Sequence, residues 1–393
     1  MTLDIRNYTP FVPFAFEKQG KGGSAYDVVI VKGTFDLYPE QIKIATVQQL
    51  PVLADHYYNE PETSSLVMEG DLVRYKPGAD IYVTGHAHRP QEAVGNEWLA
   101  QVAVAQTQVR DSVQHKTGDV LTLRHTLHLH GPRYWEAGLL GGWRLSPAET
   151  VSAIPLQYEL SFGGQFERKV KVSAQHPNGV TVEAYARNPV GIGYYHSDTM
   201  ERGKRYPAPQ IMRQGQTLDT LHDHPEPAGT TPISRWWPQR YQYAGTYDQR
   251  WQDTWQNKDG KPQEGVFPAL PADFNDRFYN AAAPGLVWPG WLQGDETLHL
   301  RGLFAQGAMQ TRLMGLRLLG IAQGGSESGR TELLKLDTLH IDLDARQVIL
   351  TWRLTMAQSL RAERVQVMFA RANEGYDAQP DDAHQSRSAD TTA

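Results

Sequence analysis

The chain has 393 residues, with 38 lysines and arginines against 44 aspartates and glutamates, and it contains no cysteine. The lack of cysteine excludes disulfides, thiolate nucleophiles, iron–sulfur clusters and cysteine-bound zinc. The formal net charge of −6 provides no general attraction to nucleic acid or to anionic membranes, so we expect neither as a partner.

The composition favours a β-rich protein with many loops. The chain has 10 Trp, 18 Tyr, 35 Gly and 24 Pro residues, and glycine and proline divide a chain into short elements. The first sixteen residues lack a basic stretch followed by an apolar run, and no stretch approaches 18 consecutive apolar residues. We therefore expect a cytoplasmic protein that does not cross a membrane.

Residues 1–130 alternate in the manner of β-strands. In the segment 121–130, four leucines and His125 mark one face, and polar residues that include His128 and His130 mark the other. The uninterrupted apolar run Val28–Val31 is typical of a strand that is buried on both faces. This part of the sequence predicts six or more strands.

The middle of the chain, residues 131–295, has little regular periodicity and holds eight of the ten tryptophans. Tyr247, Trp251 and Trp255 are spaced four apart, which predicts one face of a short helix with Thr246 as its N-cap. A structureless segment of this length is unusual inside a domain. We therefore expect long ordered loops that aromatic side chains hold in place.

Strand patterns return in residues 296–372, and the polar segment 373–393 is expected to be disordered. The predicted fold class is mainly β, with sandwich-like antiparallel sheets, long ordered loops rich in Gly, Pro and Trp, and a few short helices. The predicted parts are 1–130, 131–295 and 296–372, followed by the tail; one continuous domain over 25–372 is the alternative.

Histidine pairs are the first candidate for chemistry. On a strand, residues i and i+2 point the same way, so His86 with His88, or His128 with His130, could bind one metal ion. No aspartate or glutamate stands at a spacing typical of a metal-binding motif, and H-E-x-x-H is absent. Solvated histidines on a strand face are the competing interpretation.

Carboxylates near tryptophans are the second candidate. Asp273, Asp276, Asp295 and Glu296 lie near Trp288 and Trp291 in the sequence, as in a carbohydrate-active enzyme or binding module. The sequence does not give the separation of the carboxylates on which that mechanism depends. Motifs for a nucleophile elbow, a Walker A loop or a dinucleotide fold are absent, so no cofactor is expected.

Several blocks, taken in order along the chain, resemble a bacterial family known as domain of unknown function 2169, which occurs with type VI secretion genes. The clearest of these blocks are Lys76–Ala87, Ile154–Gly164, Asn188–Gly193, Trp237–Pro238 with Arg240, Ala244–Asp248 and Val348–Arg353. The series runs from about residue 25 to residue 355.

The resemblance implies a non-enzymatic adaptor or chaperone. Its expected partner is a secreted effector toxin or the tip protein with a proline-alanine-alanine-arginine domain, and the spike protein is a further candidate. Tryptophan, tyrosine and arginine are frequent at energetic centres of protein interfaces. The expected partner-binding residues are Trp236, Trp237, Arg240, Tyr247, Trp251 and Trp255.

Overall fold

A computed structural model describes residues 3–106, 121–139, 141–173, 175–264, 268–325 and 329–370. The tail predicted over 373–393 lies outside these ranges. Strands make up 43% of the structure and helices 6%, which confirms the prediction of a mainly β protein with antiparallel sheets and few short helices.

The largest sheet combines strands from both ends of the chain. Within the described residues its order is β2 (Val12–Gln19), β3 (Ala25–Asp36), β26 (Gln347–Ala357), β25 (Lys335–Asp342), β7 (Gly78–Thr84) and β20 (Val287–Pro289), with β4 (Lys43–Ile44) also paired to β3. The pairing of β7 with β25 is parallel, and the other neighbours in this sheet are antiparallel.

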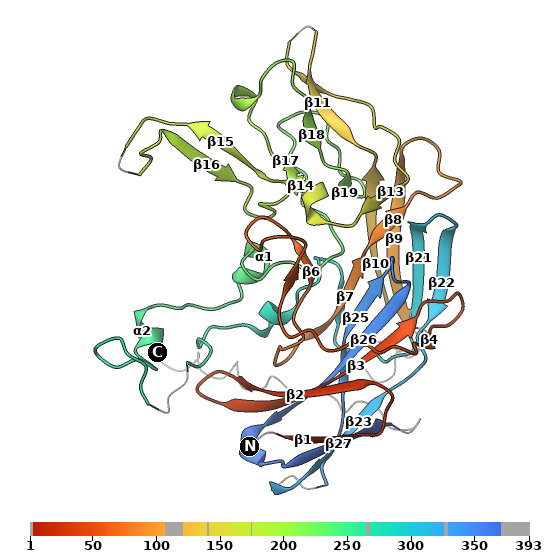
Figure 1. Cartoon of the computed structure of the whole chain (residues 1–393), viewed down its shortest axis with the longest axis vertical. Helices are drawn as coiled ribbons and strands as arrows, with labels where there is room; N and C mark the ends of the chain where they lie inside the picture. The colour runs from red at the N-terminus through yellow and green to blue at the C-terminus, as the bar shows by residue number, and fades with distance from the viewer. Residues whose placement is uncertain are drawn as a thin grey trace, which may run out of the picture.

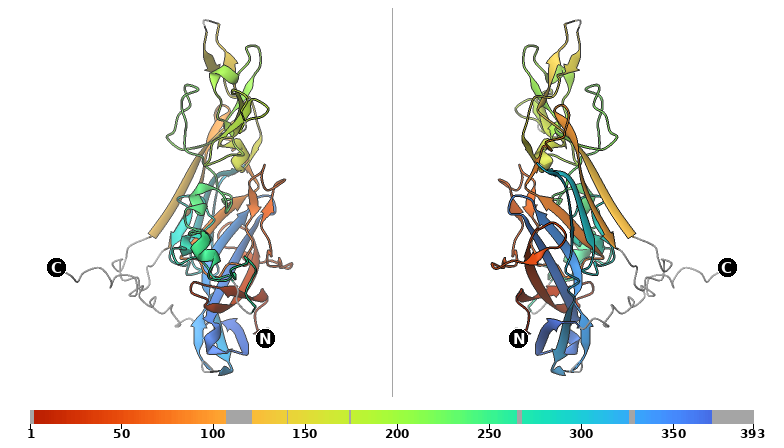
Figure 2. Two further views of the ribbon diagram at one scale, coloured as in Figure 1. Left: turned by 90° about the vertical axis from the view of Figure 1, so that its left-hand side faces the viewer. Right: turned by 90° about the vertical axis from the view of Figure 1, so that its right-hand side faces the viewer.

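A second sheet packs against the first. Its order in the described part of the chain is β19 (Ile211–Arg213), β10 (Leu121–His130), β9 (Glu97–Gln106), β21 (Thr297–Phe304) and β22 (Gly307–Arg312). Apolar side chains from both sheets, such as Val31, Ile81, Val104 and Leu300, join one continuous core. The two sheets form adjacent layers in Figures 1 and 2, and this arrangement is the expected sandwich.

Strand β3 is buried on both faces, as the run Val28–Val31 predicts. One face contributes Val29 and Val31 to the core between the sheets. The opposite face carries Lys32 and Thr34, which are also buried. The segment that follows β4 covers this face, because Gln48 and Asp71 make hydrogen bonds to these two residues. The outer face of the larger sheet therefore contains buried polar side chains at this point.

Smaller sheets surround the sandwich. Within the described residues, one sheet holds β1 (Asp4–Asn7), β27 (Arg364–Phe369), β23 (Leu318–Gln323) and β24 (Thr331–Leu333), and another holds β12 (Trp143–Leu145), β11 (Arg133–Ala137) and β18 (Tyr206–Ala208). The remaining strands form two-stranded pairs: β13 (Ala153–Pro155) with β8 (His86–His88), β14 (Phe162–Gly163) with β17 (Ile192–Gly193), β15 (Gln165–Lys169) with β16 (Val180–Ala184), and β5 (His56–Tyr57) with β6 (Leu66–Met68).

Helices are short. Those described are α1 (Pro238–Tyr241) and α2 (Gln249–Gln252), with 3-10 turns η1 (Tyr158–Leu160), η2 (Ser197–Thr199), η3 (Asp276–Tyr279) and η5 (Gln358–Leu360). In the described part of the chain, no helix has the length and apolar character needed to cross a membrane.

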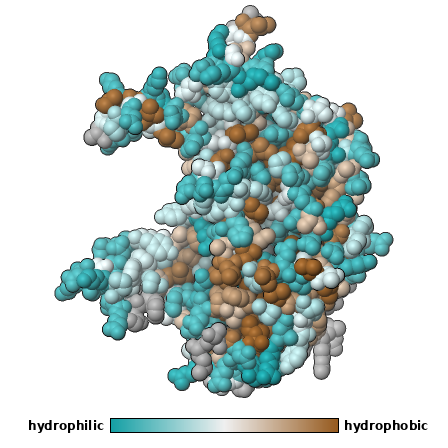
Figure 3. Space-filling model, viewed as in Figure 1, coloured by the Kyte–Doolittle hydropathy of each residue, from teal (hydrophilic) through white to brown (hydrophobic). Residues whose placement is uncertain are grey.

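The outline of the molecule is concave on one side. Figure 1 shows the hairpin β15–β16 projecting from one end of the molecule and the loop with α2 projecting on the same side, with α1 between them. The space-filling view in Figure 3 shows the hollow between these two projections.

Candidate functional site

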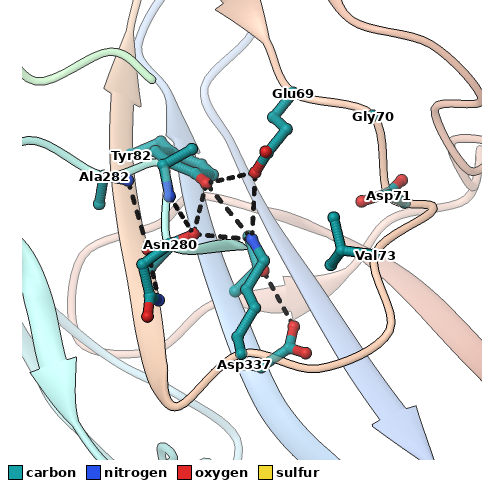
Figure 4. A network of polar contacts seen from close by, with 12 residues as sticks. Glu69, Gly70, Asp71, Val73, Tyr82, Asn280, Ala282 and Asp337 are labelled. Atoms are coloured by element: carbon teal, nitrogen blue, oxygen red, sulfur yellow. Dashed lines mark hydrogen bonds and ion pairs between the residues drawn. The ribbon is translucent and has the colours of Figure 1, made fainter. Parts of the chain in front are cut away.

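A network of buried charges lies on the outer face of the larger sheet (Figure 4). Lys76 Nζ donates to Asp80 Oδ2 at 2.7 Å and to Thr338 Oγ1 at 3.2 Å, and it lies 3.5 Å from Glu69 Oε2. The hydroxyl of Tyr82 donates to Asp80 at 2.6 Å. Asp80 and Thr338 stand opposite each other in the parallel pairing of β7 with β25, so their side chains lie on the same face.

Asn280 and two backbone amides also donate hydrogen bonds to Asp80. Asn280 Nδ2 donates to Asp80 Oδ1 at 2.9 Å, and the N–H groups of Ala281 and Ala282 donate to the same carboxylate at 3.0 and 3.3 Å. Figure 4 shows this segment beside Tyr82. Asp80 is fully buried and thus accepts hydrogen bonds from five donors, which ties the chain near residue 280 to β7.

The network is balanced in charge. Each of its carboxylates is paired with a basic side chain: Glu69 with Arg240 at 2.5 Å, Asp80 with Lys76 at 2.7 Å, Asp337 with Arg353 at 2.5 Å, and Asp71 with Lys32 at 2.8 Å. Unpaired buried charges are strongly unfavourable, so the loss of either member of a pair should destabilise the fold.

The pKa values of Asp80, Lys76 and Tyr82 are all shifted away from neutral pH. Burial tends to raise the pKa of Asp80, but the charge of Lys76 and the hydrogen bonds to the carboxylate outweigh it, and the pKa is lowered. Burial tends to lower the pKa of Lys76, but Asp80 and Glu69 outweigh it, and the pKa is raised. Burial raises the pKa of Tyr82 well above its usual value. None of these three groups is poised to exchange a proton near pH 7.

Arg240 joins this network to the concave side of the molecule. It lies on α1, where Pro238 occupies the first turn, and its side chain is only 2% exposed. Besides Glu69, the guanidinium donates to the backbone carbonyls of Ile233 and Phe278 at 2.7 and 2.8 Å. The buried charge of Arg240 therefore fixes the position of α1.

Trp236 and Trp237 precede α1 and have opposite exposures. Trp237 is fully buried and packs edge-on against Tyr158, with ring centres 5.2 Å apart. Trp236 is 42% exposed and lies edge-on to Trp237, with ring centres 6.0 Å apart. Of the expected partner-binding residues, Trp237 and Arg240 are thus buried supports, and Trp236 is the one of these three at the surface.

The second aromatic group lies around α2. The ring of Trp251 contacts those of Tyr247 and Trp255, with centres 4.8 and 5.4 Å apart, as their spacing predicts. The helix itself spans only Gln249–Gln252, so Tyr247 and Trp255 lie outside it. The prediction of Thr246 as the N-cap is wrong, because the Asp248 carboxylate accepts from the N–H of Trp251 and the helix begins at Gln249. Tyr247 is 47% exposed, whereas Trp251 and Trp255 are only partly exposed.

A shallow pocket lies next to α1. Its volume is about 460 Å³, and its lining includes Ile233, Gln239, Arg240, Tyr243, Asn280 and Trp288. Arg240 and Asn280 belong to the buried network, so the floor of the pocket is held rigidly. Tyr241, on the same helix, is 61% exposed. The helix that contributes Gln239 and Arg240 to the pocket therefore also carries an exposed aromatic residue.

The two histidine pairs of the metal hypothesis lie in different sheets. His86 and His88 are exposed on β8, which pairs with β13, and His86 Nδ1 lies 2.8 Å from Asp344 Oδ2. His128 and His130 lie on β10, which pairs with β9 and β19. The structure brings a residue that sequence spacing missed, Glu97, next to the second pair.

His128 is partly buried, and His130 is buried. Burial lowers the pKa of His128, and burial followed by the charge of Arg133 lowers the pKa of His130 to about 3. Both rings are therefore neutral at neutral pH.

Three of the four carboxylates of the carbohydrate hypothesis have local partners, whereas Asp295 Oδ1 is buried and has no hydrogen-bond partner within the described residues. Asp273 accepts from Thr246 and Asp276 accepts from Arg74. Glu296 is fully buried and accepts from the N–H groups of Gln293 and Gly294. Burial raises the pKa of Glu296 to about 7. These contacts hold loops in place.

Comparison with known proteins gives one match. Residues 22–353 match the family model described as an uncharacterized protein conserved in bacteria, DUF2169. No curated protein and no solved structure matches the chain. Because the family match spans most of its length, the chain belongs to the DUF2169 family of bacterial proteins.

Proposed function

We propose that this protein is a non-enzymatic adaptor that binds a type VI secretion effector, or a tip protein of the secretion spike, and helps to load it. The observation that carries the proposal is the set of exposed aromatic residues, Trp236, Tyr241 and Tyr247, which lie in or next to the short helices α1 and α2. The secretion context is the one implied by the resemblance of the sequence blocks to this family.

The physical basis is preorganisation. Trp and Tyr supply large contact areas at low entropic cost, and they are enriched at interface positions that dominate affinity. Trp236 rests on the buried Trp237, and Tyr247 rests on Trp251. Because these supports are already ordered, little conformational entropy is lost at the surface when a partner binds.

The buried network has a supporting role in this proposal. It connects segments near residues 69, 80, 240 and 280 through paired charges. Its groups bind one another, and the pKa values of Lys76 and Asp80 are shifted away from neutral pH, which suits a scaffold better than a reaction centre.

The place of action and the class of partner follow from the same reasoning. We propose that the adaptor works in the cytoplasm, where an effector is loaded before export. The net charge of −6 gives no support for nucleic acid or membrane lipid as a partner. A protein segment with apolar or aromatic side chains suits the pocket of about 460 Å³ beside α1.

The test is co-purification with the product of a neighbouring toxin gene, followed by a binding titration. Trp236→Ala and Tyr247→Ala should each weaken binding by about 2 kcal/mol, about thirtyfold in Kd. Tyr8→Ala is a matched control, because Tyr8 is 59% exposed and belongs to neither aromatic group. Equal affinity of all three variants, or normal effector secretion in cells without the protein, contradicts the proposal.

A further inference from the structure

Three side chains that can bind a metal converge on the outer surface of the smaller sheet. His128 and His130 are two positions apart on β10, so both point to one face. Glu97 on β9 stands directly opposite His130 in the antiparallel pairing, which places its side chain on the same face. One ligand atom from each of the three lies within 4.8 Å of the others.

The distances between these atoms approach those of a metal site. His130 Nδ1 lies 3.0 Å from Glu97 Oε2, and His128 Nε2 lies 3.5 Å from the same oxygen. Bonds of 2.0–2.1 Å in a tetrahedral zinc site place neighbouring ligand atoms about 3.3 Å apart. The side chain of Glu97 is 56% exposed, so it can adjust to an ion without disturbing the core.

His130 supplies a second, independent observation. Its side chain is only 6% exposed, and among the described residues its Nδ1 atom has no hydrogen-bond partner. Glu97 Oε2 lies 3.0 Å from this atom, yet no hydrogen bond joins the two. A buried polar atom without a partner is unfavourable, and a bound cation is one way to satisfy it.

We propose that Glu97, His128 and His130 bind a divalent transition-metal ion of the zinc class, with a coordination position left open to solvent. Two imidazoles and one carboxylate are a donor set suited to zinc, cobalt or nickel. The half-exposed Glu97 lies on the solvent side, so a water molecule or an outside ligand reaches the open position. The site is separate from the aromatic surface of the proposed adaptor function.

The positively charged side chain of Arg133 lies near this site. The charge of Arg133 acts on both histidines. Its guanidinium donates to the Pro209 carbonyl at 2.9 Å and contacts Met212 Sδ at 3.3 Å. Because like charges repel, Arg133 opposes a bound cation. Arg133→Gln should therefore tighten metal binding, whereas removal of a ligand should weaken it.

The experiment uses the full-length protein after dialysis against a chelator. Zn²⁺ is titrated calorimetrically, and Co²⁺ is followed by its visible absorption, which reports coordination by nitrogen and oxygen ligands. The wild type should bind one ion, and His128→Ala and Glu97→Gln should each weaken binding at least tenfold. His88→Ala is the matched control, because His88 belongs to another exposed pair and lies in a different sheet.

Folding is checked by thermal unfolding of each variant without metal. His128→Ala is preferred to a change at His130, because His128 is only partly buried. If the wild type binds no ion, or if His128→Ala and His88→Ala bind with the same affinity, the proposal is overturned.

Discussion

Replacement of Asp80 by alanine tests whether the buried network holds the scaffold together. The change removes the acceptor for five donors, at distances from 2.6 to 3.3 Å, and leaves the ammonium group of Lys76 without its nearest carboxylate. Lys76 is 4% exposed, so water cannot replace that partner. Removing one member of a buried ion pair costs about 3–5 kcal/mol.

The assay is equilibrium unfolding in urea, followed by tryptophan fluorescence. We expect Asp80→Ala to lower the free energy of unfolding by about 4 kcal/mol, roughly a thousandfold in the folding equilibrium. Lys76→Met should cost less, because Asp80 keeps its contacts with Tyr82, Asn280 and two backbone amides. A midpoint shift at constant slope indicates a change in stability alone.

The matched control is Glu183→Gln. Glu183 pairs with Arg168 at 3.0 Å, but both side chains are exposed, at 36% and 50%. Exposed pairs contribute about 0–1 kcal/mol. If Asp80→Ala destabilises the protein by no more than Glu183→Gln does, the network does not support the fold, and the reasoning fails.

Two further predictions concern Glu296 and Asp248. Burial raises the pKa of Glu296 from 4.5 to about 7, so the folded protein keeps this carboxyl protonated at pH values where the unfolded chain ionises it. The free energy of unfolding should therefore be highest below pH 4.5 and should fall by about 3 kcal/mol as pH rises towards 7. Glu296→Gln should remove this pH dependence in urea unfolding between pH 4.5 and 7, and an unchanged profile refutes it. Asp248→Ala removes the N-cap of α2 and should lower the free energy of unfolding by about 1 kcal/mol. The amide of Trp251 should then exchange its hydrogen faster, whereas the control change Thr246→Ala should leave that exchange rate unaffected. Equal exchange rates in the two variants contradict the capping assignment.

The fold class is visible in the sequence because strand periodicity is a local signal. The leucines of β10 alternate with polar residues over ten positions, and the structure buries Leu127 and Leu129 in the core between the sheets. The run Val28–Val31 likewise predicts burial on both faces. The N-cap of α2 is two residues later than expected, because Thr246 bonds to Asp273, a residue distant in sequence.

The buried network is not visible in the sequence because its members are far apart along the chain. Glu69 and Arg240 are separated by 171 positions, and Asp80 and Asn280 by 200. Their meeting depends on tertiary packing, because of these four residues only Asp80 lies on a strand of the large sheet, and the others lie on α1 or on connecting segments. Glu97 is missed for the same reason, because it faces His130 across two strands and not at a fixed sequence spacing.

Aromatic composition locates the region of interest but does not separate supports from contact residues. Tryptophan and arginine are frequent both in buried anchors and at interface centres. Trp236 and Trp237 are adjacent in sequence, yet one is 42% exposed and the other is fully buried. The difference arises from tertiary packing, since Trp237 meets the ring of Tyr158, which lies 79 positions earlier in the chain.

The blocks that carry the family resemblance contribute much of the scaffold. Lys76, Asp80 and Tyr82 lie in the block Lys76–Ala87, and Arg353 ends the block Val348–Arg353. These side chains are buried and paired, so they cannot distinguish one partner from another. If members of the family bind different partners, the choice has to come from exposed residues beside the scaffold. Trp236 and Tyr241, which flank the buried Arg240 outside these blocks, are positioned for that role.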